Sequence, residues 1–223
     1  MKSGMISASM MCSGLIDLKK TLRIFEESHV EYLHIDVMDG EFVPNFGLGV
    51  DYIRGLRDLT SIPLDLHLMI RNPEYKLEWI GIQKTDIVSV HYESTHHAQR
   101  TLDRLKSYGC KRFLAINPAT PVLMLEDLLD SVDGINLLMV NPGFSGQPVV
   151  PGAMRKAERL QIFLRENGRE NITVEVDGNI TPERARELRK YGAGLFVAGT
   201  SSVFQGDIDL YSRNIQTLRT AIA

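Results

Sequence analysis

The stretch Tyr32-Leu33-His34-Ile35-Asp36-Val37-Met38 has the length and the residue types of a β-strand. Side chains alternate between the two faces of a strand, so His34, Asp36 and Met38 share one face. The stretch therefore predicts a strand that carries an imidazole and a carboxylate side by side.

Similar β-rich runs recur along the chain with an average spacing of about 28 residues (223 residues over eight runs). The eight predicted strands cover residues 5–9, 32–38, 63–70, 87–91, 112–117, 134–140, 172–176 and 194–198. The segments between them have the apolar spacing of amphipathic helices, as at Leu15, Leu18, Leu22 and Phe25. Eight strand-helix units in this length predict a (β/α)8 barrel, whose usual length is about 250 residues with a lower limit near 200.

A doubly wound open sheet is the alternative α/β architecture. Its dinucleotide-binding form has a G-x-G-x-x-G turn after the first strand, whereas this chain continues as Met10-Met11-Cys12-Ser13-Gly14. The sequence also has no Pro/Ser-rich linker, low-complexity tract or change of composition that would divide it. We therefore predict one (β/α)8 barrel domain over residues 1–223.

The composition of the chain limits which partners it can bind and indicates the cell compartment. The 25 Lys and Arg residues against 28 Asp and Glu give a net charge of -3, which offers no general attraction for nucleic acid or an anionic membrane. The first residues lack the apolar stretch of a secretion signal, and no segment reaches the about 20 apolar residues of a membrane span. Cys12 and Cys110 lack the spacing of a metal or redox motif, so we interpret both as buried and reduced. We expect a cytoplasmic homo-oligomer that binds neither nucleic acid nor membranes.

Polar residues at the carboxyl ends of predicted strands are the first candidates for function, because (β/α)8 barrels build their active sites there. His34 and Asp36 lie in the second predicted strand, His67 in the third, and Asp177 directly after the seventh. A packed interior cannot hold two carboxylates without a compensating cation. Two imidazoles and two carboxylates suit zinc, iron, cobalt or manganese. We predict that these four residues bind one such divalent ion per chain.

Glycine-containing turns follow the sixth, seventh and eighth predicted strands, where barrels commonly hold a phosphate on backbone N–H groups. These turns predict a phosphorylated small molecule as ligand. The candidate phosphate-binding residues are Gly143, Phe144, Ser145, Gly146, Gly178, Asn179, Gly199 and Thr200. The methionines near strand ends are either core residues or the walls of a pocket for a flat, delocalised anion. They are Met38, Met69 and Met139.

Four runs of the sequence resemble the signatures of the ribulose-phosphate 3-epimerase family, and the similarity extends over essentially the whole chain. The runs are HIDVMDGEFVPN (34–45), LDLHLM (64–69), VNPGFSGQ (140–147) and EVDG (175–178). The resemblance implies that Asp36 and Asp177 are the catalytic acid/base pair as well as metal ligands, together with His34 and His67. It also implies that Ser9 and His67 contact the substrate.

The implied reaction is the epimerisation of a ketose phosphate at C3, and our first expectation is D-ribulose 5-phosphate to D-xylulose 5-phosphate. Two carboxylates on opposite faces of the substrate can remove the C3 proton on one side and return a proton on the other. The intermediate is a cis-enediolate, whose negative charge a metal ion would stabilise. Such a reaction requires no nicotinamide, flavin or other organic cofactor.

Two departures from the family pattern leave the substrate open. Gly178-Asn179 stands where the family has Gly-Gly, and the turn at 199–204 is one residue longer than usual. The longer turn, together with Met11-Cys12 and Ser28-His29, resembles the allulose-6-phosphate 3-epimerase branch. Conversion of D-allulose 6-phosphate to D-fructose 6-phosphate is therefore the alternative.

Proteins of other classes also remain to be considered. A Schiff-base aldolase needs a lysine on a strand, and the predicted strand cores contain none, so this class is disfavoured. The Asp-x-Lys-x-x-Asp run of orotidine-phosphate decarboxylase relatives is also missing, because the corresponding stretch is Asp36-Val37-Met38-Asp39. A sugar-phosphate-binding protein without catalytic activity is the remaining alternative.

Overall fold

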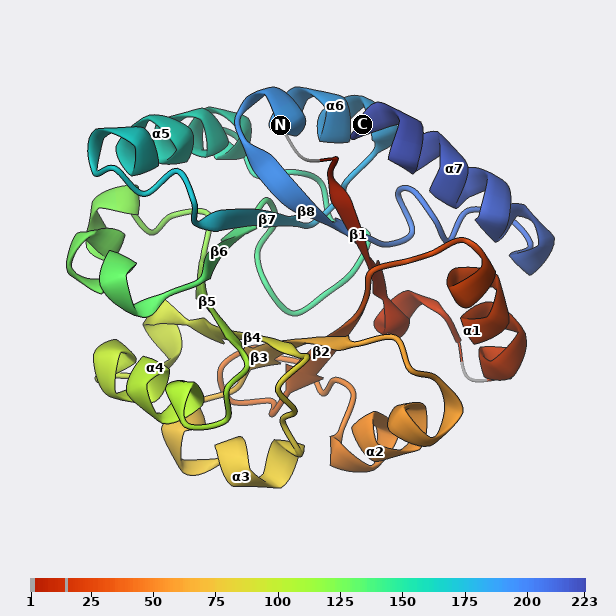
Figure 1. Cartoon of the computed structure of the whole chain (residues 1–223), viewed down its shortest axis with the longest axis horizontal. Coiled ribbons are helices and arrows are strands. Elements are labelled where there is room, and N and C mark those ends of the chain that lie inside the picture. The colour runs from red at the N-terminus through yellow and green to blue at the C-terminus, as the bar shows by residue number, and fades with distance from the viewer. Residues whose placement is uncertain (1–2, 15) are drawn as a thin grey trace.

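Parallel pairing of each strand with the next along the chain, and of β8 with β1, closes the sheet into a barrel (Figure 1). The computed structural model describes residues 3–14 and 16–223. The strands are β1 (Met5–Ser9), β2 (Tyr32–Met38), β3 (Leu64–Met69), β4 (Ile87–His91), β5 (Lys111–Ile116), β6 (Gly134–Leu138), β7 (Thr173–Asp177) and β8 (Ala193–Ala198). The predicted (β/α)8 barrel is confirmed.

Two differences from the predicted strand bounds, at β6 and β7, affect the carboxyl end of the barrel. The prediction extended the sixth strand to residue 140, but β6 ends at Leu138 because the Met139 carbonyl accepts from Val150 N–H as the chain turns away. The seventh strand lies one residue later than predicted, so that Asp177 belongs to β7 itself. Its carboxylate is therefore held by the sheet and does not depend on the conformation of a loop.

Helices surround the barrel and cover the outer face of the strands (Figure 1). They are α1 (Leu18–Glu27), α2 (Val50–Leu59), α3 (Leu77–Ile80), α4 (Ala98–Lys106), α5 (Ala153–Glu166), α6 (Pro182–Lys190) and α7 (Tyr211–Ala221). Leu15, the first residue of the helical spacing noted above, lies outside the described residues. The connection from β5 to β6 departs from the expected pattern, because a 3₁₀ helix, η4 (Val122–Ser131), takes the place of an α-helix. Shorter 3₁₀ turns are η1 (Met10–Cys12), η2 (Pro73–Tyr75), η3 (Tyr92–Ser94) and η5 (Ile208–Leu210).

Apolar and polar side chains are sorted between the two faces of the strands. Leu33, Ile35 and Val37 of β2 belong to the main core between the sheet and the helices. The barrel interior contains a separate apolar layer near the amino ends of the strands, formed by Tyr32, Ile87, Phe113 and Leu195. Closer to the carboxyl ends the interior is polar. The buried polar residues there include Ser7, His34, Asp65, His67, Ser89 and Glu175.

The register between neighbouring strands decides which of these polar residues meet. His34 pairs with Asp65 and Asp36 pairs with His67 across β2 and β3. Leu138 of β6 pairs with Asp177 of β7. The polar side chains of β2 and β3 thus lie beside one another at the carboxyl end of the barrel.

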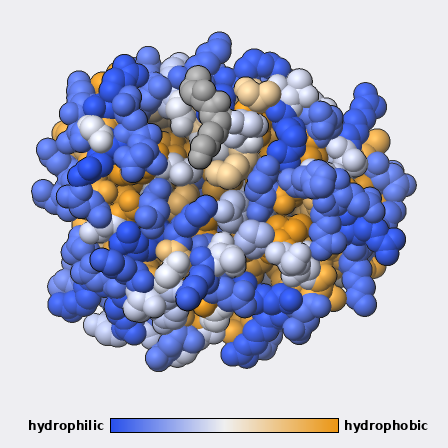
Figure 2. Space-filling view, viewed as in Figure 1, coloured by the Kyte–Doolittle hydropathy of each residue, from blue (hydrophilic) through white to orange (hydrophobic). Residues whose placement is uncertain are grey.

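The outer surface is mostly hydrophilic on the face seen in Figure 2, with apolar residues showing mainly between the polar ones. Among the described residues, no helix combines the length and the apolar character needed to cross a membrane.

The apolar layer of the barrel yields a test of the fold. A Cβ added at Gly134 in β6 would lie 2.3 Å from the ring of Phe113, so we expect Gly134→Ala to destabilise the protein by about 1–3 kcal/mol through overpacking. Gly55 is the matched control, because it lies in α2 with no atom near an added Cβ. Gly55→Ala should stabilise by about 0.5–1 kcal/mol through its effect on backbone entropy. Urea denaturation of both variants measures the two changes, and equal stability of Gly134→Ala and the parent chain would contradict the packing described.

Candidate active site

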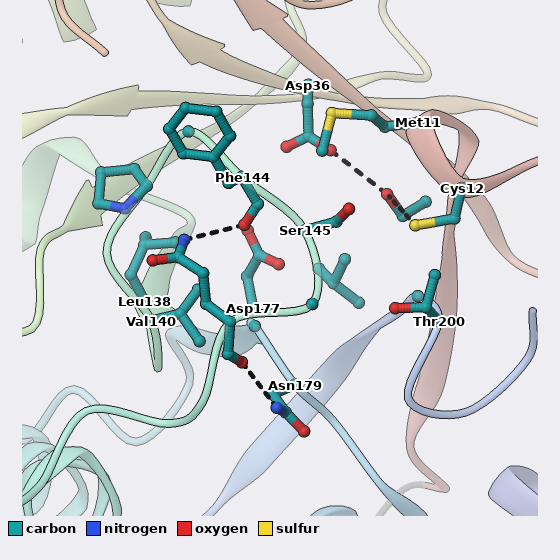
Figure 3. A pocket seen from close by; sticks show the side chains of 18 of the residues that line it. Met11, Cys12, Asp36, Leu138, Val140, Phe144, Ser145, Asp177, Asn179 and Thr200 are labelled. Atoms are coloured by element: carbon teal, nitrogen blue, oxygen red, sulfur yellow. Dashed lines mark hydrogen bonds between the residues drawn. The ribbon is translucent and has the colours of Figure 1, made fainter. Parts of the chain in front are cut away.

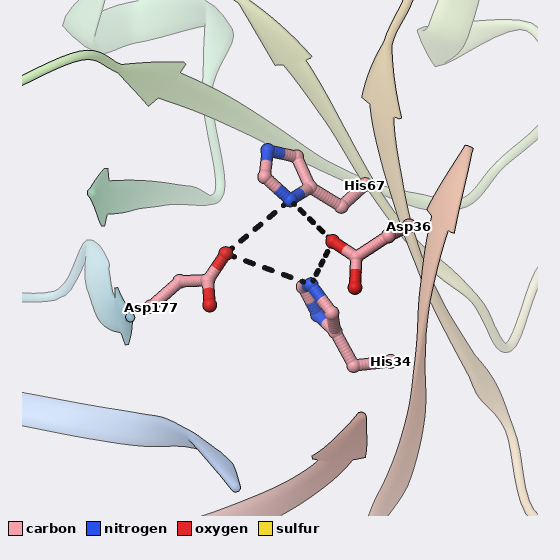
Figure 4. A group of neighbouring side chains, drawn as sticks. All are labelled: His34, Asp36, His67 and Asp177. Atoms are coloured by element: carbon pink, nitrogen blue, oxygen red, sulfur yellow. Dashed lines mark hydrogen bonds and ion pairs between the residues drawn. The ribbon is translucent and has the colours of Figure 1, made fainter. Parts of the chain in front are cut away.

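Four side chains from three strands converge at the carboxyl end of the barrel (Figure 4). His34 and Asp36 come from β2, His67 from β3 and Asp177 from β7. Asp36 Oδ1 lies 3.3 Å from both His34 Nε2 and His67 Nδ1. Asp177 Oδ2 lies 3.7 Å and 3.4 Å from the same two nitrogens. One nitrogen or oxygen atom of each side chain therefore faces a common centre.

The arrangement passes a simple test for a metal ion. Ligand atoms bound about 2.0–2.2 Å from a tetrahedral ion stand roughly 3.3–3.6 Å apart. The four nitrogen-oxygen separations above, at 3.3–3.7 Å, match that spacing. His34 Nε2 is buried and makes no hydrogen bond within the described chain. A polar nitrogen is costly to bury without a partner, so the four residues could hold one divalent ion.

The carboxylates and the histidines of this cluster change one another's pKa values. Burial lowers the pKa of His67, but hydrogen bonds with Asp177 and Asp36 outweigh it and raise the pKa to about 9. Burial also opposes the charge on His34, yet Asp65 and Asp36 hold its pKa well above the usual range. The pKa of Asp36 is lowered because the attraction of His34 exceeds the penalty of burial. The carboxylates are thus balanced by imidazolium protons, which a metal ion would displace.

His34 is oriented from behind by a second buried carboxylate. Its Nδ1 lies 2.6 Å from Asp65 Oδ2, which also accepts from Ser7 Oγ at 2.7 Å. Burial and the neighbouring Asp65 raise the pKa of Glu175 well above its usual range, so Glu175 is neutral beside an ionised Asp65. Asp65 holds the Nδ1 proton and leaves His34 Nε2 to face the cluster. The prediction assigned no role to Asp65 or Glu175, although each precedes a candidate ligand by two residues and so shares its face of the strand.

The cluster opens into a cavity of about 600 Å³ free of protein atoms, part of it open to solvent (Figure 3). Asp36, His67 and Asp177 line it, and Ser9 Oγ donates to Asp36 Oδ2 at 3.3 Å. The structure brings all eight candidate phosphate-binding residues to this cavity. They are Gly143, Phe144, Ser145, Gly146, Gly178, Asn179, Gly199 and Thr200. No Lys or Arg occurs among the described lining residues.

Two of the glycine turns are joined by side chains. Asn179 has a left-handed backbone (φ 53°), and its Nδ2 donates to the Gln147 carbonyl at 2.7 Å (Figure 3). Gln147 Nε2 donates in turn to the carbonyls of Asn141 and Phe144. Gly178 (φ 109°) packs so closely that an added Cβ would lie 2.6 Å from Val140. The turns after β6 and β7 therefore form one connected wall of the cavity.

The methionines divide between the cavity and the core. Met38 and Met69 line the cavity together with Met11 and pack around Val43. Met139 does not reach the cavity, because side chains alternate at the end of β6: Leu138 points into the cavity and Met139 into the core.

One further residue corrects an expectation and another was missed. Cys12 is only partly buried and lines the cavity, 3.9 Å from Ser9 Oγ, so the interpretation of Cys12 as a buried residue was wrong, whereas Cys110 is buried. His91, at the end of β4, is fully buried with its Nε2 2.8 Å from His67 Nε2. Burial lowers the pKa of His91 to about 4. Its place at a strand end was the only signal in the sequence.

A barrel with this cluster at its strand ends, beside a wall of glycine turns, has its polar groups where enzymes of this fold have their active sites. The model of the ribulose-phosphate 3 epimerase family matches residues 5–204, and the chain belongs to this family. It is 35% identical to ribulose-phosphate 3-epimerase of Bacillus subtilis over 202 residues, which cover 91% of this chain and 93% of that protein. It is 39% identical to the chloroplastic ribulose-5-phosphate-3-epimerase of Arabidopsis thaliana over 201 residues, 89% of this chain and 71% of that protein.

Solved structures with low sequence identity share the fold. The 3-keto-L-gulonate-6-phosphate decarboxylase of Vibrio cholerae superposes with a TM-score of 0.72 at 13% identity, covering 99% of this chain and 98% of that one. That protein is a decarboxylase by name, so sharing the (β/α)8 barrel does not by itself define the reaction.

The raised pKa values in the cluster predict a pH dependence of metal binding. Because His67 must lose its Nδ1 proton to bind an ion, the affinity for Mn²⁺ should rise with pH and level off above about pH 9. The same proton stabilises the metal-free fold below the ordinary pKa of 6.5, and that contribution should be lost as the pH rises through about 9. Calorimetric titration in buffers of different ionisation enthalpy counts the protons released at pH 7.5. An affinity that does not change with pH would contradict this assignment of charge.

Proposed function

We propose that this chain interconverts D-ribulose 5-phosphate and D-xylulose 5-phosphate by epimerisation at C3. The observation that carries the proposal is the pair of carboxylates, Asp36 and Asp177, which reach one cluster from β2 and β7 and both line the cavity. Membership of the family and the similarity to ribulose-phosphate 3-epimerases support the same reaction.

His34, Asp36, His67 and Asp177 would hold one divalent ion, for which zinc, iron, cobalt and manganese are the candidates. Bound there, the ion supplies Lewis-acid stabilisation where negative charge develops on the substrate oxygens. No organic cofactor takes part in this proposal.

Asp36 and Asp177 exchange the C3 proton. The carbonyl at C2 makes that proton acidic, so one carboxylate removes it as a general base and the other, as its acid, delivers a proton to the opposite face. The intermediate is a planar cis-enediolate. Ser9 Oγ donates to Asp36 Oδ2 and so orients this carboxylate, while His67, Met38 and Met69 surround the reacting carbons.

The glycine turns after β6, β7 and β8 bind the phosphate through backbone N–H groups. Positive φ at Gly143 (116°), Gly146 (77°) and Gly178 (109°) allows the backbone conformations that side chains would hinder. Phe144 and Ser145 lie between the first two glycines, and Gly199 and Thr200 form the opposite wall.

D-allulose 6-phosphate is the second candidate substrate, and one observation favours it. Met11-Cys12 and residues 199–201 of the longer turn, which carry the resemblance to the allulose-6-phosphate 3-epimerase branch, line the cavity. Side-by-side kinetics with D-ribulose 5-phosphate and D-allulose 6-phosphate decide between the two. A protein that binds both without turnover would be the non-catalytic alternative.

Domain organisation, assembly and compartment are also part of the proposal. We propose that residues 1–223 form one domain that works in the cytoplasm as a homo-oligomer, with no nucleic-acid or membrane partner. The net charge of -3 supports the lack of a nucleic-acid partner. Exposed apolar side chains such as Phe46 and Leu123 offer contact surface to a second copy.

The two carboxylates can be separated by isotope exchange. Asp36→Asn and Asp177→Asn should each lower net epimerisation by about 10²- to 10⁴-fold, because each variant lacks either the base or the acid. The surviving carboxylate can still lift the C3 proton of the epimer that faces it, so solvent deuterium should enter one epimer in Asp36→Asn and the other in Asp177→Asn. Proton NMR at C3 measures this exchange.

Metal content must accompany these measurements because both residues are also candidate ligands. A metal-replete Asp177→Asn enzyme that epimerises at close to the parent rate would refute the two-carboxylate mechanism.

The phosphate assignment is tested at Gly199. An added Cβ there would meet only Cys12 Sγ, at 3.5 Å, so the fold should accept Gly199→Val. The valine blocks close approach of the phosphate, and KM should rise by about tenfold or more, a loss of about 1.4 kcal/mol of binding free energy. An unchanged thermal unfolding midpoint is the control. Equal turnover of D-ribulose and D-ribulose 5-phosphate by the parent chain would overturn the assignment.

A further inference from the structure

His91 has no part in the proposed reaction, yet it touches a candidate metal ligand inside the barrel. Its Nε2 lies 2.8 Å from His67 Nε2, and the two rings stack at 20° with centroids 5.0 Å apart. Two nitrogens at that distance share one proton, so one donates and the other accepts. The direction of this hydrogen bond decides which nitrogen of His67 keeps a lone pair.

Glu93 fixes the direction from the outer end. Its Oε1 accepts from the Asn117 backbone N–H at 2.8 Å and from the Thr120 hydroxyl. Its Oε2 lies 3.3 Å from His91 Nδ1. An ionised carboxylate only accepts, so His91 carries its proton on Nδ1 and has a bare Nε2. His67 must then donate from Nε2, which leaves Nδ1 facing the cluster.

The surroundings of His91 offer no competing arrangement. The side chain is fully buried, and the ring of Phe42 covers it with centroids 4.8 Å apart. Within the described residues, the partners of its ring nitrogens are His67 and Glu93. The alternative tautomer of His91 would direct Nδ1 without a proton at the Glu93 carboxylate, and its Nε2–H could donate only to a His67 that carries no proton on Nε2.

We propose that His91 and Glu93 are positioning residues that hold His67 as its Nε2–H tautomer and so prepare Nδ1 to bind the metal ion. The inference rests on the proposed metal site. It assigns the two histidine ligands separate supports: a carboxylate, Asp65, behind His34, and a neutral imidazole backed by a carboxylate behind His67.

Glu93→Gln tests the direction of the hydrogen bonds that run from His67 through His91 to Glu93, with almost no change in the shape of the side chain. Two donors converge on Oε1, so the amide oxygen should take that position and the NH₂ group should face His91 Nδ1. His91 would then move its proton to Nε2 and oppose the N–H of His67. We expect Zn²⁺ affinity, measured by chelator competition, to fall by about 10- to 100-fold.

Glu74→Gln is the matched control for replacing a carboxylate that accepts from threonine hydroxyls. Glu74 is buried, whereas Glu93 is partly buried, and it accepts from the Thr95 and Thr101 hydroxyls but has no contact with His91 or His67 among the described residues. Its substitution should leave Zn²⁺ affinity unchanged. An equal loss in Glu74→Gln and Glu93→Gln would show that charge alone matters and would overturn the proposal.

Two variants of His91 separate hydrogen bonding from packing. His91→Phe fills the space but cannot accept from His67, and it should lower Zn²⁺ affinity by about 10- to 100-fold. His91→Gln can present its amide oxygen to His67 and should recover part of that loss. Unchanged Zn²⁺ affinity in His91→Phe would reduce His91 to a packing residue, and a loss in His91→Gln as large as in His91→Phe would show that an acceptor for His67 does not matter; either result would contradict the proposal.

The tautomers themselves are visible by long-range ¹⁵N–¹H NMR of histidine-labelled protein. The metal-free parent chain should show His91 protonated on Nδ1, and the zinc-loaded chain should show His67 protonated on Nε2. His91 protonated on Nε2 would overturn the proposal whatever the variants do. Failure of the parent protein to bind Zn²⁺, Mn²⁺ or Co²⁺ would instead refute the proposed metal site. The tautomer of His91 in the metal-free protein would still test the direction of the hydrogen bonds among His67, His91 and Glu93.

Discussion

The parallel register between β2 and β3 is the constraint on which the site depends. It sets Asp36 beside His67 and His34 beside Asp65, so ligand candidates and their support are fixed by the same backbone hydrogen bonds that close the barrel. A slip of one residue would turn every one of these side chains toward the helices and bring apolar residues inside. The main core, which holds Leu33, Ile35 and Val37 against the helices, opposes such a slip with the full hydrophobic free energy of that face.

Burying polar groups inside the barrel costs desolvation free energy, which the protein offsets with hydrogen bonds and with one carboxyl group that keeps its proton. Glu175 stays neutral beside the ionised Asp65, and Asp65 is in turn bonded to Ser7 and His34. Each buried charge thus has an opposite charge or a donor next to it, as burial in a low-dielectric interior demands. The apolar layer of Tyr32, Ile87, Phe113 and Leu195 closes the interior toward the amino ends of the strands. The positions of the buried polar side chains are therefore fixed by the strands that carry them and not by the loops.

Much of the fold and the centre of the site could be predicted because both follow from local rules. Strand alternation placed His34, Asp36 and Met38 on one face, and the barrel architecture brought His67 and Asp177 to the same end. The contribution of His91 was not predictable in this way, since a single histidine at a strand end is more often a core residue, and its role depends on a contact between strands. Met139 was assigned to the pocket from its nearness to the strand end, although alternation along β6 places it on the core face and Leu138 on the cavity face. The partial exposure of Cys12 could not be predicted, because it lies in the short 3₁₀ turn η1, which has no strand or helix periodicity. The 3₁₀ helix η4 buries Leu125 and Leu129, four residues apart as in an α-helix, so the apolar spacing of this segment did not reveal its 3₁₀ geometry.

The wall of glycine turns contains no Lys or Arg among the described residues that line the cavity. Backbone dipoles act over a few ångströms and fall off faster with distance than a formal charge. A dianionic ligand is therefore recognised by these turns only once it is inside, because none of the described lining residues adds a formal positive charge that would attract it from solvent. Ionic strength should, for the same reason, weaken this recognition less than it would weaken binding by a cluster of exposed lysines.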